Sequence, residues 1–194
     1  MALTPEYPPV ATPLDADELA SLIPKHISTQ SELNEWEQLN IEQGEGWARR
    51  QRKDILSDAF VRQLHQQMFG ETWSWAGNFR KSNKNIGVDW PQISVKLRDL
   101  FNDTQYQIVH ATYPPNEIAT RFHHRLVLIH PFPNGNGRHA RMMADLLVQQ
   151  LGQPKFTWGS KNLTALTETR TRYITALRAA DGGDIKPLLA FVRS

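Results

Sequence analysis

The segment at residues 128–143, LIHPFPNGNGRHARMM, concentrates groups that can move a proton and carry positive charge. His130 can take a proton from an incoming hydroxyl near neutral pH. The glycines of PFPNGNG let backbone N–H groups converge in conformations that residues with a Cβ avoid, which creates a site for an anion. Arg138 and Arg141 stand three residues apart, on one helical face, where two guanidinium groups can hold successive phosphates. The segment therefore predicts a general base beside a phosphate-binding loop.

Two predicted helices position these groups. Asn116 is expected to cap a helix whose apolar residues have helical spacing, and Pro131 ends that helix, so His130 is expected at a helix C-terminus. The next helix begins at about Gly137, so that its free N–H groups and positive dipole end face the same loop. Asn-Gly pairs are also the commonest signal for tight turns, and the same residues are compatible with a plain connection between two helices.

The rest of the chain predicts a mainly α domain with one β ribbon. Further helices are expected at about 29–50, 58–69, 92–111, 163–180 and 185–192. The segment NFRKSNKNIGVDWP alternates polar and apolar residues, which is typical of a short hairpin. Residues 1–28 are rich in proline and predict an extended N-terminal arm with one short helical turn near Asp15 to Leu22. The expected organisation is an arm at 1–28 followed by one domain at 29–194.

Composition narrows the class of protein. The 194 residues contain no cysteine, which excludes disulfides and thiolate metal sites and favours a cytoplasmic location. Twenty-two Lys and Arg residues against 20 Asp and Glu residues leave a formal charge of +2, which gives no reason to expect direct nucleic-acid binding. No apolar segment is long enough to predict a membrane span.

Residues 130–141, HPFPNGNGRHAR, resemble the Fic family motif H-P-F-x-[D/E]-G-N-G-R-x-x-R at every fixed position except the acidic one. LHQQMFGETWSWAGNFR, NIGV and YITALRAADGGDIKPLLAFV also resemble segments that flank this motif in the family, so the resemblance runs from about Glu32 to Phe191. Within the family, the chain is most similar to the subgroup called mobile mystery protein B.

The resemblance implies a Fic-type helical bundle with a short β-hairpin flap. It also implies a protein adenylyltransferase, which transfers AMP from ATP to a Ser, Thr or Tyr hydroxyl of a target protein and releases pyrophosphate. His130 would be the general base and Phe132 a buried anchor for the loop. The phosphates would be bound by Gly135, Asn136, Gly137, Arg138 and Arg141.

Two further regions take roles from the resemblance. The hairpin at Lys81 to Val88 would be the flap that pairs with an extended target segment, with Ile86, Gly87 and Val88 as docking residues. Tyr173 falls where the family places residues beside the adenine, although simple helix packing explains it equally well.

One position departs from the family motif. Asn134 stands where most members carry an Asp or Glu that binds the Mg²⁺ bridging two phosphates. An amide oxygen can ligate Mg²⁺ but lacks the charge, so we expect Mg²⁺ to be retained but bound more weakly. Relatives such as Doc, which phosphorylate their targets, carry a lysine at the position of Gly137, so this glycine favours nucleotidyl transfer.

Many family members inhibit themselves with a helix that bears [S/T]-x-x-x-E-[G/N]. Ser31 and Glu35 have this spacing, but Trp36 follows them; Glu45 and Gly46 have the ending, but Ile41 replaces the hydroxyl residue. Because no intact copy is present, we expect inhibition by a partner protein in trans or no inhibition.

Three alternatives remain open. The chain could be a catalytically weak nucleotide-binding module of regulatory or toxin-antitoxin type, or it could transfer a different nucleotide. A zinc hydrolase built from His123, His124 and His130 is poorly supported, because neighbouring histidines diverge on a helix and no H-E-x-x-H is present.

Overall fold

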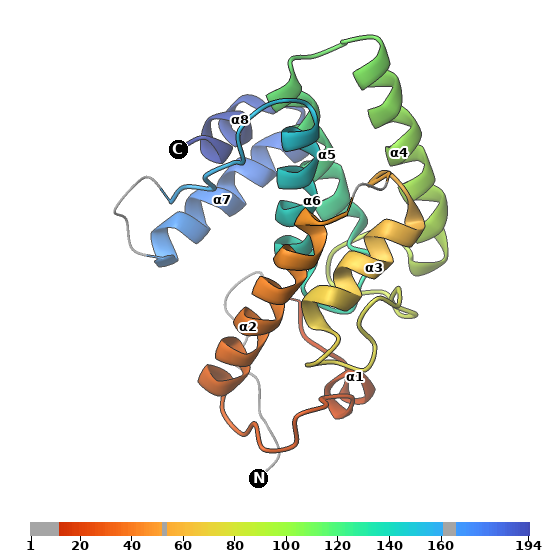
Figure 1. The fold of residues 1–194 in the computed structure, drawn as a ribbon, viewed down its shortest axis with the longest axis vertical. Coiled ribbons are helices and arrows are strands. Elements are labelled where there is room, and N and C mark those ends of the chain that lie inside the picture. The colour runs from red at the N-terminus through yellow and green to blue at the C-terminus, as the bar shows by residue number, and fades with distance from the viewer. Residues whose placement is uncertain (1–11, 52–53, 161–165) are drawn as a thin grey trace.

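A computed structural model describes residues 12–51, 54–160 and 166–194, and these residues form a bundle of helices (Figure 1). The described elements are α1 (Ala16–Ala20), α2 (Gln30–Arg49), α3 (Asp58–Phe69), the 3-10 helix η1 (Trp90–Gln92), α4 (Ile93–Val109), α5 (Pro115–Ile129), α6 (Asn136–Gln150), α7 (Leu166–Asp181) and α8 (Lys186–Val192). The mainly α architecture expected from the sequence is confirmed.

Local signals explain where the helices begin. The Thr29 side chain accepts a hydrogen bond from the Glu32 backbone N–H, and the Glu32 carboxylate accepts one from the Thr29 N–H, which completes a capping box at the start of α2. The expected cap at Asn116 is wrong by a small margin, because α5 begins at Pro115 with Pro114 as its N-cap. A proline lacks the N–H that a first-turn residue would leave unpaired, so it fits this position.

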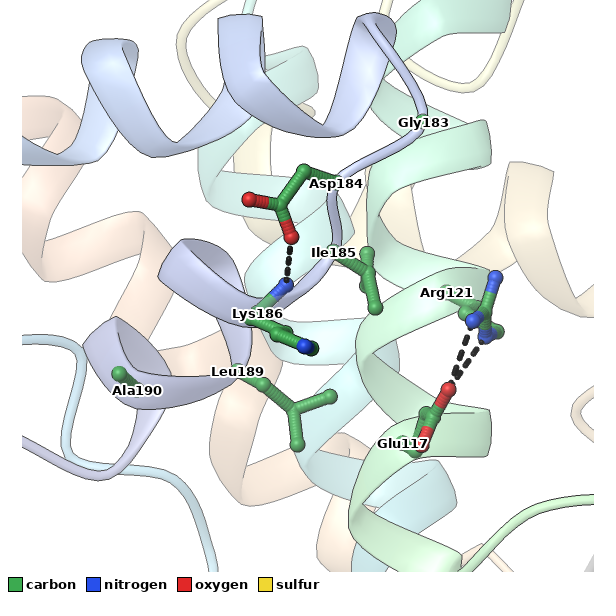
Figure 2. A pocket seen from close by; sticks show the side chains of 8 residues that line it. All are labelled: Glu117, Arg121, Gly183, Asp184, Ile185, Lys186, Leu189 and Ala190. Atoms are coloured by element: carbon green, nitrogen blue, oxygen red, sulfur yellow. Dashed lines mark hydrogen bonds and ion pairs between the residues drawn. The ribbon is translucent and has the colours of Figure 1, made fainter.

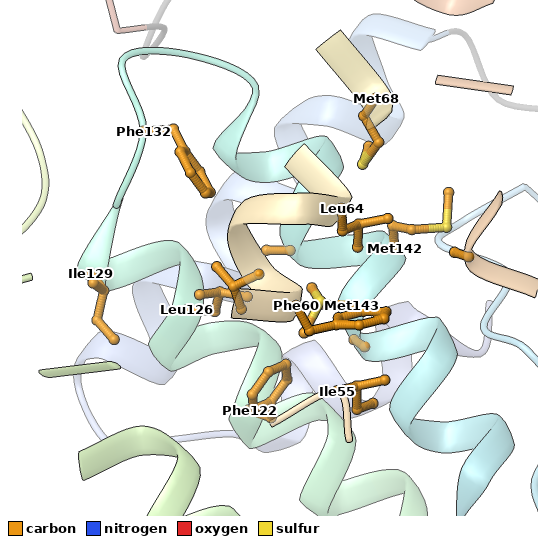
Figure 3. Packing of buried hydrophobic residues seen from close by; sticks show 14 of the residues in the cluster. Ile55, Phe60, Leu64, Met68, Phe122, Leu126, Ile129, Phe132, Met142 and Met143 are labelled. Atoms are coloured by element: carbon orange, nitrogen blue, oxygen red, sulfur yellow. The ribbon is translucent and has the colours of Figure 1, made fainter. Parts of the chain in front are cut away.

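Helices α5 and α6 form the centre of the bundle (Figure 1). Helix α5 packs against α4, α6 and α8, while α6 also contacts α2 and α3. Figure 3 shows side chains of α3, α5, α6 and the loop between α5 and α6 meeting in one apolar cluster. Phe132 from the loop is fully buried in this cluster. Burial of a phenylalanine contributes about 1.5–3 kcal/mol, so the phosphate-loop candidate is tied to the core.

The short β-hairpin expected at residues 81–88 is not formed. Among the described residues, β pairing is limited to an isolated antiparallel bridge between Leu22 and Trp73. The buried Arg80 side chain instead bridges this segment, because its guanidinium donates to the carbonyls of Ser82 and Val88. The Arg80 side chain therefore donates to carbonyls that, in a hairpin, would accept backbone N–H groups of the opposite strand. We call residues 81–88 the flap segment.

The described part of the N-terminal arm, residues 12–28, packs against the chain that follows α3. Its helical turn is α1, as expected. The Ile23 N–H donates to the Thr72 carbonyl at 2.9 Å, and the Ser74 N–H donates to the Ser21 carbonyl at 3.2 Å. In the described parts of the chain, no helix is long and apolar enough to cross a membrane.

Candidate functional site

His130 ends α5 in a left-handed conformation, with φ 52° and ψ 60°. A residue with a side chain adopts this conformation only where its surroundings hold it. Its backbone N–H donates to the Leu126 carbonyl at 3.3 Å, and its carbonyl accepts a hydrogen bond of 2.7 Å from Arg80 Nε. These bonds at both ends of the residue turn the chain out of the helix and fix the position of the imidazole.

The electrostatic surroundings keep His130 neutral. Burial, followed by the positive charges of Arg80 and Lys84, lowers its pKa to about 4, while the Val127 carbonyl acts in the opposite direction. An imidazole with this pKa is unprotonated at neutral pH and can accept a proton. Its Nε2 atom lies 3.2 Å from the hydroxyl oxygen of Thr12, so the ring already faces an alcohol.

The loop after His130 is held in shape by Asn136. The Asn136 amide oxygen accepts from the Phe132 N–H at 2.9 Å, and its amide nitrogen donates to the Phe132 carbonyl at 2.8 Å. The Phe132 ring also stacks on His65, with ring centres 3.7 Å apart. The Asn136 side chain is thus committed to the loop itself, and its backbone N–H, in the first turn of α6, is the group available to an anion.

Gly135 and Asn134 form the tightest part of the loop. Gly135 has φ 76°, and an added Cβ would lie 2.7 Å from the Phe69 ring, so glycine is required here. The Asn134 amide oxygen accepts from the Gly135 N–H at 2.5 Å, and the Asn134 carbonyl lies 3.1 Å from His65 Nε2. At Gly137, by contrast, an added Cβ would meet no atom within 4 Å, which leaves open space beside the loop.

His65 is a supporting residue that the sequence patterns did not identify. Its Nδ1 accepts a hydrogen bond of 3.1 Å from the Gly77 N–H, so the ring proton resides on Nε2 and is donated to the Asn134 carbonyl. Burial, then the neighbouring His139, lowers the His65 pKa well below its usual value. This neutral histidine therefore holds the backbone of the loop at Asn134.

Arg138 forms an ion pair that was not expected. Its Nη1 lies 2.7 Å from the Glu37 carboxylate on α2, and the other Glu37 oxygen accepts from Trp73 Nε1 at 2.8 Å. Glu37 does not belong to an [S/T]-x-x-x-E-[G/N] motif, because Leu33 and Gln38 occupy the two flanking motif positions.

Glu35 and Glu45, which belong to the two incomplete inhibitory motifs, make ordinary surface contacts. Glu35 accepts from Ser31 Oγ at 3.4 Å, and Glu45 pairs with Arg49 and Lys155 at 2.7 and 2.6 Å. Neither contact involves an arginine of the loop. Glu37 is therefore the acidic residue that α2 brings to the site.

Arg141 and Tyr173 lie together on the α7 side of the site. The Arg141 guanidinium carbon is 5.6 Å from the centre of the Tyr173 ring. The Tyr173 hydroxyl lies 2.9 Å from His123 Nε2, and its ring centre is 5.5 Å from that of Phe191. Burial raises the pKa of Tyr173 to about 12. These contacts give Tyr173 a packing role, and a role beside an adenine stays a prediction.

The flap segment lies directly against His130. Gly87 has φ 103°, and an added Cβ would lie 2.7 Å from the Cβ of His130. The Val88 N–H donates to the Ile129 carbonyl at 3.4 Å, while the Ile86 side chain is partly exposed at 37%. Gly87 therefore lies beside the base and Val88 beside the residue that precedes it, although the flap segment forms no strand.

The three histidines of the zinc hypothesis do not converge. His123 lies beside Tyr173, His124 pairs with Asp181 at 2.8 Å, and His130 faces Thr12. Within the described residues, no group of three His, Cys, Asp or Glu side chains is arranged to hold a metal ion.

A surface pocket lies between α5, the turn before α8 and α8 itself (Figure 2). Its volume is about 550 Å³, and its lining includes the Glu117–Arg121 ion pair and Lys186. It shares no residue with the loop or the flap segment, so the candidate site is defined by those two elements.

Proteins of known structure share this architecture. BepC from Bartonella tribocorum, solved with bound AMPPNP, superposes with a TM-score of 0.70 at 19% identity, over 92% of this chain and 97% of that chain. Fic-1 from Caenorhabditis elegans superposes with a TM-score of 0.65 at 26% identity, over 81% of this chain and 48% of that chain. The helical bundle of this chain therefore has the Fic-type fold of these solved proteins.

The sequence comparisons agree with the fold. Residues 55–148 match the Fic/DOC family. Protein adenylyltransferase fic-1 of C. elegans is 37% identical over 144 residues, which are 72% of this chain and 27% of that protein. Residues 55–148 of this chain are therefore a Fic/DOC family domain. The chain spans about a quarter of the length of the curated relatives that it matches.

Proposed function

We propose that this chain is a protein adenylyltransferase that uses His130 as its general base. The observation that carries the proposal is the neutral imidazole at the end of α5, beside a glycine loop that leads into the N-terminus of α6 and its two arginines. The relatives named protein adenylyltransferase support it, as does the nucleotide analogue bound to the similar BepC structure.

In the proposed reaction, the hydroxyl oxygen of a target residue attacks the α-phosphorus of ATP. A new O–P bond forms, the bond to the bridging oxygen breaks, and pyrophosphate leaves. His130 Nε2 takes the hydroxyl proton as that bond forms. The N–H groups of the first turn of α6 would stabilise the charge on the phosphate oxygens, because the helix dipole adds to their effect.

Arg138 and Arg141 would neutralise the negative charge of the outer phosphates. Arg141 is held by the packing of its guanidinium near Tyr173, which keeps it oriented for an outer phosphate. Arg138 is engaged by Glu37, so it would exchange a carboxylate for a phosphate when ATP binds. The flap segment would hold an extended target segment next to His130.

The Asn134 side chain in the loop fits a role as one of several ligands of Mg²⁺. Asn134 offers a single neutral amide oxygen, which already accepts the Gly135 N–H and has a second lone pair. Such a donor suits a hard cation whose other ligands are phosphate oxygens and water. Bound Mg²⁺ would neutralise phosphate charge.

A second candidate function is a nucleotide-binding regulatory module with little catalysis. The neutral metal donor at Asn134 and the ion pair between Arg138 and Glu37 together favour it.

The expected partner is a target protein with an acceptor hydroxyl. Inhibition by another protein in trans and membership in the mobile mystery protein B subgroup stay hypotheses that rest on the sequence resemblance. The lack of cysteine supports the expected cytoplasmic location.

The test compares ATP labelled at the α-phosphate with ATP labelled at the γ-phosphate, in the presence of Mg²⁺ and a bacterial lysate. We expect label from the α-phosphate alone, and its loss in His130→Ala while ATP binding is kept. His110→Ala replaces an exposed histidine and is the matched control. Transfer that survives in His130→Ala, or ATP binding without any transfer by the wild type, would overturn the proposal.

A further inference from the structure

Thr12 occupies the position in front of the base. Its hydroxyl oxygen lies 3.2 Å from His130 Nε2, and the residue is only 8% exposed although it belongs to the N-terminal arm. The two residues are 118 positions apart in the chain, so the contact is created by the fold alone. Because His130 is neutral, its Nε2 can accept the hydroxyl proton when the ring proton is on Nδ1.

Ionic contacts hold the arm on the flap segment. Lys84 Nζ lies 2.8 Å from the Asp15 carboxylate and 2.6 Å from the Glu18 carboxylate, and its side chain is only 3% exposed. Ser82 Oγ donates to Asp15 at 2.9 Å. The arm therefore covers the same segment that the resemblance assigns to target docking.

The backbone of the arm suits this position. Thr12 precedes Pro13, and a residue before proline is restricted to extended conformations. Three residues later, Asp15 has φ −69° and ψ 162°, also extended, before α1 begins. An extended segment with its hydroxyl at the base has the form of a bound substrate.

We propose that Thr12 is an acceptor for AMP within its own chain, so that the N-terminal arm is a substrate in cis. The proposal rests on the proposed adenylyltransferase activity. Thr12 Oγ1 attacks the α-phosphorus of ATP, the bond to the bridging oxygen breaks, pyrophosphate leaves, and His130 Nε2 takes the proton. The product is an AMP phosphodiester of Thr12. Until the arm is displaced, a hydroxyl of another protein competes with Thr12 for the base.

The first experiment measures self-labelling of the full chain by ATP labelled at the α-phosphate. Thr12→Val keeps the shape of the side chain but removes the hydroxyl. We expect it to reduce the self-label at least about tenfold relative to wild type. Thr12→Ser should retain the label, and Thr112→Val, at an exposed threonine, is the matched control. Circular dichroism and thermal unfolding of each variant establish that it folds.

Mass spectrometry then locates the modification. The first Lys or Arg in the chain is Lys25, so trypsin leaves Thr12 in a peptide that also contains the hydroxyl residues Thr4, Tyr7 and Ser21. Fragmentation should assign the added AMP to Thr12. Full self-labelling of Thr12→Val, or AMP at another residue of wild type with none at Thr12, would overturn the proposal.

A mixing experiment tests whether transfer occurs in cis. Wild type is incubated with a His130→Ala chain of different length, and transfer in cis labels the wild-type chain only, at a rate per molecule that does not depend on protein concentration. Label of comparable intensity on Thr12 of the His130→Ala chain would overturn the cis assignment. Label in lysate proteins without self-label would overturn this proposal alone, whereas no label in any protein would overturn the proposed function as well.

Discussion

Glu37 of α2 and Arg138 of α6 form an ion pair of 2.7 Å across the candidate phosphate site. The Glu37 side chain is 7% exposed and the Arg138 side chain 33% exposed, so the carboxylate approaches from the protein interior. A carboxylate and an outer phosphate would need the same guanidinium group. The ion pair therefore opposes productive ATP binding through Arg138.

We expect Glu37→Gln to raise AMP transfer by about tenfold, because the neutral amide leaves Arg138 free for phosphate and still accepts from Trp73 Nε1. Label transfer from α-labelled ATP and the KM for ATP are the measurements. Glu35→Gln, at an exposed position of the same helix, is the matched control. Equal rates for Glu37→Gln and wild type would contradict this role of the ion pair.

Asn134→Asp should lower the Mg²⁺ concentration that gives half-maximal transfer by about tenfold, because a carboxylate adds the charge that a hard-cation site prefers. The measurement is a titration of transfer rate against Mg²⁺ at fixed ATP. Glu71→Gln at the surface serves as a control for a change of one charge. An unchanged titration curve would show that this position does not contact the ion.

Asn136→Asp should behave differently from its neighbour. The Asn136 amide nitrogen donates to the Phe132 carbonyl, and a carboxylate would place an acceptor against that acceptor. We expect a loss of about 2 kcal/mol in the free energy of unfolding. Urea unfolding of the two aspartate variants is the measurement. A smaller loss for Asn136→Asp than for Asn134→Asp would refute the assignment of Asn136 to loop structure.

Helix positions and the motif loop were predictable because their signals are local. The capping box at Thr29, the cap at Ser57 and the stop before Pro131 each involve residues within one helical turn, and the structure has helices at these places. The loop glycines and the two arginines also depend on short spacing. Helix α6 begins slightly earlier than expected, at Asn136, because the left-handed Gly135 serves as its N-cap.

The parts that sequence reasoning missed depend on contacts between distant residues. The bond from His65 to Asn134 joins residues 69 positions apart, and the Glu37–Arg138 pair spans 101 positions. The flap segment alternates polar and apolar residues as a hairpin does, but the Arg80 guanidinium, and not a partner strand, donates to its carbonyls. A pattern read along the chain does not contain these pairings, because helix packing creates them.

Buried histidines should make stability fall in acid. Burial lowers the pKa of His123 and of His139 to about 3, whereas a histidine in the unfolded chain titrates near about 6.5. Below that pH the unfolded state binds more protons than the folded state, so each histidine removes about 1.4 kcal/mol of stability per pH unit until its folded pKa is reached. Asp145, whose pKa burial raises to about 6, acts in the opposite direction below pH 6.

The measurement is the free energy of urea unfolding at closely spaced pH values from about 7.5 to 5, a window that spans the pKa of histidine in the unfolded chain. Stability should be highest above the unfolded pKa and decrease below it. His139→Gln can still donate to the Val61 carbonyl, and it should reduce the slope below pH 6.5 by about 1.4 kcal/mol per unit. His110→Gln, at the surface, should leave the slope unchanged. The same slope in His139→Gln and wild type would mean that the His139 imidazole is protonated in the folded protein, and its burial would then not account for the loss of stability in acid.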